Sequence, residues 1–369
     1  VFLELNKEYD LIKYRKDILD TKSTSFCGAK WYNATTWLGS GTTASCHHPP
    51  AHKIPLHEIS ADPSAIHNTQ HKKAMRKMMQ RGERPRECEY CWKVEDMGTD
   101  AVSDRVYKSI IYTNSDLKKA HEADHNDNTL LKTFEIAFDR TCNLACSYCN
   151  SSFSTTWAKD IKKHGPYQNM VSDGAAAFQH DGAWADPYGK KEENPYVTAF
   201  WDWWEDGLSE SLEELRVTGG EPLMSDQVWK LFDWFENNPS DMRFAVNSNL
   251  IAKKSIVDRL IEKSQGVKKF HLYTSCEATG KQAEYIRDGL DYELWTNNIT
   301  RFIKEGNYEG INIMMTINSL CLFSITDFLD DVFKLKELTK SKTPVFSVNL
   351  LRFPSFQSPL SLPDHIKDY

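Results

Sequence analysis

The sequence predicts an α/β protein in which parallel strands alternate with helices, preceded by a small cysteine-rich module. Three observations lead to this prediction. Strand-like and helix-like segments alternate from about residue 133 onward, which is typical of parallel strands joined by right-handed crossovers. Seven of the nine cysteines fall into two groups, four before residue 100 and three between residues 142 and 149. The 369 residues suffice for such a sheet and an appended module.

Each element is predicted from the spacing of its apolar residues. Strands are expected near 131–139, 213–217, 242–246, 268–274, 310–317 and 344–351. Helices are expected near 225–237, 253–264, 292–306 and 326–339. The corresponding division of the chain is a cysteine-rich module at 1–100, a linker at 101–132 and a strand–helix domain at 133–369. The first residue is Val and the chain ends soon after the sixth strand, which leaves open a missing segment at either end.

Composition and charge exclude several classes of protein. A net charge of −7 argues against a large contact surface for nucleic acid, because that affinity rests mainly on Lys and Arg. The sequence has no run of about 18 apolar residues, and no basic start followed by an apolar core, so we expect neither a membrane span nor a secretion signal. We expect a cytoplasmic protein, in which an odd number of cysteines favours metal binding or catalysis over disulfides.

Cys142, Cys146 and Cys149 follow the pattern C-x-x-x-C-x-x-C directly after the strand expected at 131–139. Thiolates are soft ligands that suit iron–sulfur clusters or zinc. Structural zinc usually takes four protein ligands, so three thiols with no fourth Cys or His beside them favour a cluster with one open iron. A zinc loop that borrows a distant ligand is the alternative. The position at the end of a strand is where α/β barrels place their chemistry.

Three further motifs follow in the sequence. In "VTGGEPLM" (217–224), Gly219 and Gly220 allow close approach of the backbone, and Glu221 can accept a hydrogen bond from an ammonium group. A tight turn before a helix is the alternative reading. In "LYTSCEATG" (272–280), Ser275 and Glu277 are expected to face one side of a strand, with Cys276 packed in the core. The third motif is "AVNSNL", at 245–250.

Over about 133–354 these four motifs, in this order, resemble the radical S-adenosylmethionine superfamily. The resemblance implies a partial (β/α)6 TIM-like barrel and a 4Fe–4S cluster whose open iron binds S-adenosylmethionine. It implies reductive cleavage of that cofactor to a 5′-deoxyadenosyl radical, with the electron supplied by a donor such as flavodoxin or ferredoxin. Tyr148 is expected beside the adenine, or as a shield for the cluster. The other expected cofactor contacts are Gly219, Gly220, Glu221, Asn249, Ser275, Glu277 and Arg287. Arg287 would pair with the cofactor carboxylate, unless it is only a residue on a helix surface.

The N-terminal cysteines form two pairs, Cys27 with Cys46 in C-x13-G-x4-C, and Cys88 with Cys91 in C-x-x-C. Four thiols can complete a site, and spacing alone makes zinc the default metal. The pattern is similar to the SPASM and twitch modules of radical enzymes, which implies a second 4Fe–4S cluster here, before the barrel. Four thiolate ligands leave no open iron, which favours an electron-transfer role. His47 and His48 either compete as ligands or are surface residues.

An aromatic insertion is expected at about 165–204, because 69 residues separate Cys149 from Gly219. We interpret it as a cap over the barrel mouth, with Trp201, Trp203 and Trp204 on a helix. Packing of that helix on the barrel is the alternative.

The predicted function is a radical oxidoreductase that oxidatively modifies a peptide or protein side chain. The second candidate is a radical dehydrogenase or cyclase that acts on a small metabolite such as an alcohol, sugar or nucleotide. The third is a catalytically inactive scaffold with structural clusters. The sequence identifies no catalytic acid or base.

Overall fold

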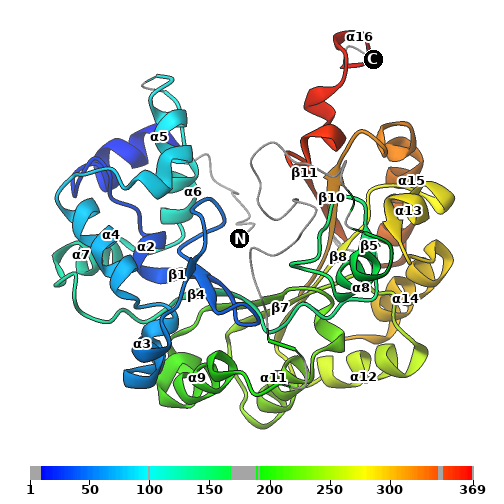
Figure 1. Ribbon diagram of the computed structural model, residues 1–369, viewed down its shortest axis with the longest axis horizontal. Coiled ribbons are helices and arrows are strands. Elements are labelled where there is room, and N and C mark those ends of the chain that lie inside the picture. The colour runs from blue at the N-terminus through cyan, green and yellow to red at the C-terminus, as the bar shows by residue number, and fades with distance from the viewer. Residues whose placement is uncertain are drawn as a thin grey trace. The chain divides into compact units, whose positions relative to one another are not determined.

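The computed structural model describes residues 10–98, 100–165, 167, 188–189, 192–339 and 344–367 (Figure 1). The chain divides into two compact units, each treated by itself. Unit 1 consists of Val1–Ile136 and Asn194–Glu213, and unit 2 consists of Ala137–Glu193 and Glu214–Tyr369. Within the described ranges, no helix has both the length and the apolar character that crossing a membrane requires.

Unit 2 is built on a parallel sheet whose strand order follows the chain. Its strands are β6 (Glu214–Thr218), β7 (Arg243–Ser248), β8 (Lys269–Ser275), β10 (Gly310–Ile317) and β11 (Val345–Leu350). The helices between them are α11 (Asp226–Asn237), α12 (Lys254–Ser264), α14 (Tyr292–Glu305) and α15 (Ile325–Thr339). Each of these elements begins and ends within two residues of its predicted bounds, so the strand–helix alternation is confirmed. The unit is a mixed α/β structure, and its completion to a six-stranded partial barrel stays a prediction.

The two faces of this sheet differ in chemistry because side chains alternate along each strand. One face is apolar and packs on the helices (Figure 1), with the Phe232 ring of α11 centred 5.1 Å from Phe244 of β7 and 5.4 Å from Phe270 of β8. The other face is polar. There the Tyr273 hydroxyl accepts a hydrogen bond of 2.7 Å from Arg243, and the Arg216 guanidinium lies 4.1 Å from the centre of the Tyr273 ring.

Shorter elements complete unit 2. They are β5 (Ala145–Cys146), α8 (Thr155–His164), η6 (Pro222–Met224), α13 (Gly280–Ile286), β9 (Arg287–Asp288), η7 (Leu322–Ser324), η8 (Ser355–Gln357), η9 (Pro359–Ser361) and α16 (Asp364–Lys367). Strands β5 and β9 pair antiparallel in a separate small sheet.

Unit 1 combines short helices with an antiparallel sheet, in which β2 pairs with both β1 and β3. Its strands are β1 (Asn33–Trp37), β2 (Thr42–Ala44), β3 (His52–Lys53) and β4 (Thr133–Ala137), which leads into unit 2. Its helices are α1 (Leu11–Tyr14), η1 (Arg15–Leu19), α2 (Ala29–Tyr32), α3 (Leu56–Ala61), η2 (Pro63–Ile66), α4 (Gln70–Gln80), η3 (Arg86–Cys88), α5 (Glu89–Glu95), α6 (Asp104–Ser109), α7 (Asn114–Glu122), α9 (Pro195–Trp203), η5 (Trp204–Leu208) and α10 (Ser209–Ser211).

The segment 101–132, expected to be a linker, folds as α6 and α7 within unit 1. Val106 and Leu117 are fully buried, in the same hydrophobic cluster as Cys88 and Cys91. A capping box between Thr113 and Asp116 begins α7. Burial of these apolar side chains makes the segment part of the core of unit 1.

The predicted insertion is described only in part. Residues 166, 168–187 and 190–191 lie outside the described residues, and the cap expected there is not addressed. Its helix α9 belongs to unit 1 and carries Trp201 and Trp203, while Trp204 begins η5. All three indoles are buried, and the Trp203 ring lies 6.3 Å from the ring of Phe134 on β4. These tryptophans therefore pack within unit 1, where they meet β4, the strand expected to begin the barrel.

Candidate functional site

The loop that carries Cys142, Cys146 and Cys149 lies between β4 and α8 and is anchored at several points. The backbone carbonyl of Cys142 accepts hydrogen bonds from Thr155 (3.2 Å) and Thr156 (2.7 Å). On the other side, Cys146 lies on β5 and pairs with Arg287 on β9. Fixed backbone at both ends of the loop pre-positions the three thiols before any metal binds.

The surroundings of the three thiols change how readily they lose their protons to a metal. Burial is the main cause that raises the pKa of Cys142 to about 11 and that of Cys149 to about 12, and burial also raises the pKa of Cys146. The thiolates also repel one another. A metal that binds here must therefore displace protons, and it relieves that repulsion.

The three sulfurs do not lie as close together as a single zinc ion would hold them. Zinc at about 2.3 Å from each sulfur would hold the sulfurs within about 4 Å of one another. Among the described residues, no three thiols have their sulfur atoms within 4.8 Å of one another. A 4Fe–4S cluster holds its thiolates further apart, since each sulfur binds a different iron.

Gly219 and Gly220 bring the loop after β6 against the cysteine loop. A Cβ atom on Gly220 would lie 2.3 Å from the carbonyl oxygen of Thr141, and one on Gly219 would lie 2.9 Å from that of Asp139. Gly219 also has a φ of +124°, a conformation that other residues rarely adopt. The Glu221 N–H then donates to the Thr141 carbonyl at 2.7 Å. The close approach that the glycines allow is thus to the chain's own backbone.

The Glu221 carboxylate lies at the centre of a set of donors. It accepts hydrogen bonds from the backbone N–H of Leu223 (3.0 Å), the Ser248 hydroxyl (2.7 Å) and the backbone N–H of Asn249 (2.7 Å). Burial outweighs these bonds and raises the pKa of Glu221 to about 7. A carboxylate has about four acceptor positions, so one is left for a further donor. The Asn249 side chain donates to Asn143 of the cysteine loop at 2.9 Å.

Tyr148, Glu277 and Arg287 form a buried cluster beside Cys146. Arg287 donates to one Glu277 oxygen from Nη2 (2.6 Å) and Nε (3.2 Å), and the Tyr148 hydroxyl donates to the other at 3.2 Å. Arg287 Nη1 lies 3.8 Å from the Cys146 sulfur, and its guanidinium lies 5.4 Å from the centre of the Tyr148 ring. Arg287 is therefore buried in β9, not exposed on a helix, because it neutralises Glu277.

Ser275 and Glu277 do not share a strand face, since β8 ends at Ser275 and Glu277 follows it. In the described part of the chain the Ser275 hydroxyl has no hydrogen-bond partner. Cys276 is fully buried, with its thiol 3.4 Å from the Ala278 carbonyl, which confirms its place in the core.

In unit 1, the four N-terminal cysteines line one pocket. Cys27 precedes α2, Cys46 follows β2, Cys88 ends η3, and Cys91 lies on α5. Burial is the main cause that raises the pKa of Cys88 and of Cys91 to about 12. The pocket is also lined by Lys30, Ser45, His48, Asp104, Arg105 and Lys108. Three cations and one carboxylate around four thiols suit an anionic thiolate-bound group.

His47 and His48 both point to Asp104 at the edge of this pocket. The Asp104 carboxylate accepts from His48 Nε2 at 2.6 Å, and His47 Nε2 lies 3.4 Å away. The His48 ring stacks on Tyr90, with ring centres 3.8 Å apart. Sequence reasoning missed Lys30 and Asp104 as pocket residues. The lysine in "FCGAKW", flanked by apolar residues, is the one signal that the sequence offers.

Comparison with known proteins gives few likenesses. No model of a protein family matches the chain, and no curated protein matches its sequence. Similar solved structures include Streptococcus suis SuiB bound to S-adenosylmethionine, with 14% identity over 88% of this chain and 64% of that chain and a TM-score of 0.41. SuiB bound to its precursor peptide SuiA has 15% sequence identity over 86% of this chain and 62% of that chain, with a TM-score of 0.38. Native anSMEcpe with bound AdoMet has 16% sequence identity over 57% of this chain and 50% of that chain, with a TM-score of 0.36.

The chain thus spans less than two-thirds of each of these proteins. TM-scores below 0.5 carry no argument about function, which must come from the chain's own residues. The chain resembles the radical S-adenosylmethionine superfamily in its sequence motifs, which run from the three-cysteine loop to the Ser-x-Glu segment.

Proposed function

We propose that the chain is a radical S-adenosylmethionine enzyme that oxidatively modifies a peptide or protein substrate. The observation that carries the proposal is the three-thiol loop of unit 2, which is anchored by α8 and β9 and met by the Glu221 loop. Burial and mutual repulsion raise the pKa values of its thiols, and binding of a metal would relieve that repulsion. When bound to Cys142, Cys146 and Cys149, a 4Fe–4S cluster supplies the electron that cleaves S-adenosylmethionine to a 5′-deoxyadenosyl radical.

The chain's own residues then bind and orient the cofactor. Glu221 offers its remaining acceptor position to the cofactor ammonium, and the Ser275 hydroxyl is available to the ribose. Tyr148 contributes an aromatic surface whose hydroxyl is held by Glu277. Arg287 acts as a positioning residue, because it holds Glu277 and lies beside Cys146. Asn249 fixes the cysteine loop through Asn143.

A second 4Fe–4S cluster on Cys27, Cys46, Cys88 and Cys91 is part of the proposal. The cations that line the pocket around the four thiols support it, since a thiolate-bound cluster is anionic. With four thiolate ligands it transfers electrons and does not bind substrate. It would take the surplus electron that a two-electron oxidation of the substrate releases. An electron-transfer role for the second cluster distinguishes this proposal from the alternative of an inactive scaffold, in which the clusters are only structural.

Deuterium transfer tests both the reaction and the class of substrate. Cells that naturally make this protein are grown in D2O, and their extract is separated by ultrafiltration into macromolecular and small-molecule fractions. Each fraction is incubated with reduced, iron-loaded protein and S-adenosylmethionine. We expect deuterium in 5′-deoxyadenosine with the macromolecular fraction, and its loss after protease treatment. Transfer from the small-molecule fraction would support the metabolite alternative, and absence of 5′-deoxyadenosine under all conditions would reject a radical enzyme.

Cofactor affinity should depend on pH through Glu221, whose pKa is raised to about 7. Only the ionised carboxylate attracts the cofactor ammonium, so we expect affinity to rise about tenfold from about pH 6 to about pH 8. Equilibrium dialysis measures this, with Glu221→Gln expected to give a flat profile. The same raised pKa favours protonated Glu221 in the folded chain. Its stabilising contribution is complete below the usual 4.5 and is lost as the pH rises through about 7.

A further inference from the structure

The buried ion pair Lys30–Glu87 lies beside the four N-terminal cysteines in unit 1. Lys30 belongs to α2, has a relative exposure of 2%, and lines the cysteine pocket. Its backbone is fixed on both sides, because its N–H donates to the Cys27 carbonyl (3.0 Å) and its carbonyl accepts from Arg76 (3.1 Å). Its ammonium donates to the Glu87 carboxylate and interacts electrostatically with the thiols of Cys88 and Cys46.

Glu87 immediately precedes Cys88, and its carboxylate has two side-chain partners. Besides Lys30, it accepts a hydrogen bond of 2.5 Å from His71 Nε2, whose side chain is 43% exposed. Lys30 is the more deeply buried member of the pair, with its side chain 2% exposed against 14% for Glu87, whose carboxylate also contacts a histidine at the surface. Water screens a buried charge far less than an exposed one, so Lys30 exerts the stronger field on the pocket.

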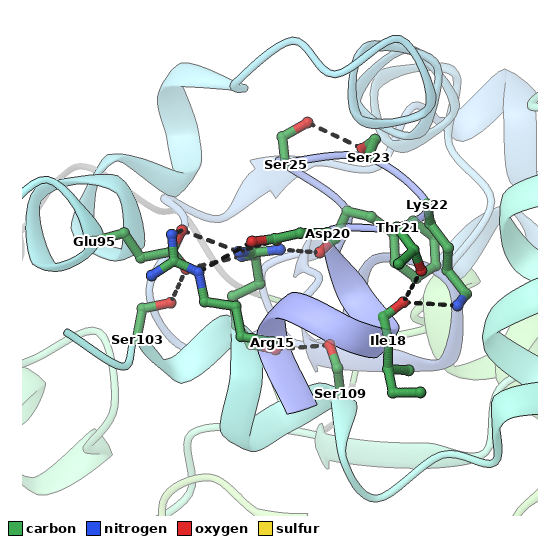
Figure 2. Close-up of polar contacts among 12 residues, drawn as sticks. Arg15, Ile18, Asp20, Thr21, Lys22, Ser23, Ser25, Glu95, Ser103 and Ser109 are labelled. Atoms are coloured by element: carbon green, nitrogen blue, oxygen red, sulfur yellow. Dashed lines mark hydrogen bonds and ion pairs between the residues drawn. The ribbon is translucent and has the colours of Figure 1, made fainter. Parts of the chain in front are cut away.

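The other cations of the pocket are weaker candidates for such a field. Arg105 binds Glu95 at 2.8 Å and Asp20 at 3.0 Å, so two carboxylates neutralise its charge. Figure 2 shows Glu95, Asp20 and Ser103 within this network, together with Arg15. Lys108 is half-buried, so water screens its charge more than that of Lys30, although it also interacts electrostatically with the Cys46 thiol. Asp104, the carboxylate of the pocket, is engaged by the two histidines.

We propose that the Lys30–Glu87 pair sets the reduction potential of the cluster on Cys27, Cys46, Cys88 and Cys91, with Lys30 raising the potential and Glu87 lowering it. The inference rests on the proposed second cluster. An all-thiolate cluster is anionic and gains one negative charge on reduction, so a buried cation stabilises the reduced form more than the oxidised form. A carboxylate at similar distance has the opposite effect.

The reaction that this potential serves is a one-electron transfer. The substrate-derived radical loses one electron to the cluster and one proton to solvent, and a new bond or double bond forms in the substrate. The reduced cluster then passes its electron to a one-electron acceptor of the ferredoxin or flavodoxin class. A raised potential favours the first transfer and keeps the oxidised product from being reduced again.

Two substitutions of opposite sign test the proposal on the full, iron-loaded protein. Redox titration followed by electron paramagnetic resonance gives the potential of each cluster. The cluster whose signal S-adenosylmethionine perturbs is that on Cys142, Cys146 and Cys149. For the other cluster, Lys30→Met should shift the potential to a more negative value and Glu87→Gln to a more positive value. The double variant should fall between the two single variants, since both charges are gone.

An exposed ion pair near the same cysteines in sequence provides the matched control. Lys93 lies 3.2 Å from Glu89, with side-chain exposures of 73% and 60%. Water screens this pair, so Lys93→Met should leave both potentials unchanged. A purely structural role for Lys30 would not produce opposite shifts from the two members of one pair.

Three outcomes would overturn the inference. If Lys30→Met and Glu87→Gln leave the potential unchanged, or shift it in the same direction, the pair does not set it, and the proposed second cluster still stands. If Lys30→Met does not fold, the absence of a positive shift in Glu87→Gln is sufficient to reject the idea. If metal analysis of the wild-type protein finds zinc in place of the second cluster, the inference and that part of the proposed function fail together.

Discussion

Replacing Cys142, Cys146 and Cys149 by Ala should abolish formation of 5′-deoxyadenosine and halve the iron content, from about eight to about four per chain. The physical reason is that these three thiols and the N-terminal four belong to different compact units, each with its own core. Loss of one set removes one cluster and leaves the ligands of the other in place. Iron analysis after anaerobic reconstitution, together with product analysis by chromatography, measures both quantities.

The reciprocal variant and a matched cysteine provide the controls. Replacing Cys27, Cys46, Cys88 and Cys91 by Ala should also leave about four irons, but should preserve cleavage of S-adenosylmethionine without substrate. Cys276→Ala removes a buried thiol that hydrogen-bonds to the Ala278 carbonyl and belongs to neither cysteine group, and should change neither quantity. Full iron content in the three-cysteine variant would contradict the assignment of that cluster.

Much of unit 2 could be predicted from the sequence because its elements are local and periodic. Alternation in β7, for example, places Phe244 and Val246 on the buried face and Asn247 on the polar one, whatever the rest of the chain does. The two cysteine groups are equally visible, since metal ligands must be close in space and often lie close in sequence. The structure places each group together, in a loop of unit 2 and a pocket of unit 1.

What the sequence could not reveal depends on contacts between distant residues. The paired glycines predict a close backbone approach at Gly220, but no local pattern identifies Thr141 as the segment that it meets. The partner of Arg287 is Glu277, which lies at the end of a different element, so helix spacing gave no signal for the pair. The sequence predicts a linker at 101–132, yet Val106, Tyr112 and Leu117 lie in the core of unit 1. The sequence shows Lys30 among apolar residues, but only the pocket shows that it lies beside the cysteines.

Arg287→Met should lower the free energy of unfolding by about 3–5 kcal/mol. Glu277 is 1% exposed and would be left as a buried carboxylate without its cationic partner. Met fills a similar volume, so the loss would come from charge and not from a cavity. Urea denaturation of the metal-free protein, followed by the fluorescence transition, measures the change. As a control, Arg301→Met breaks a pair with Asp258 in which both side chains are solvent-exposed, and should cost no more than about 1 kcal/mol.

The double variant Arg287→Met with Glu277→Gln separates the charge effect from packing. Breaking a buried pair is costly because one charge is left unpaired, whereas removing both charges is often nearly neutral. We therefore expect the double variant to be more stable than either single variant. It should still bind S-adenosylmethionine more weakly, because an amide oxygen holds the Tyr148 hydroxyl less strongly than a carboxylate does. The double variant could instead lose as much stability as the two single variants lose together. That result would mean that Arg287 and Glu277 stabilise the cysteine loop independently, through separate contacts such as that of Arg287 with Cys146.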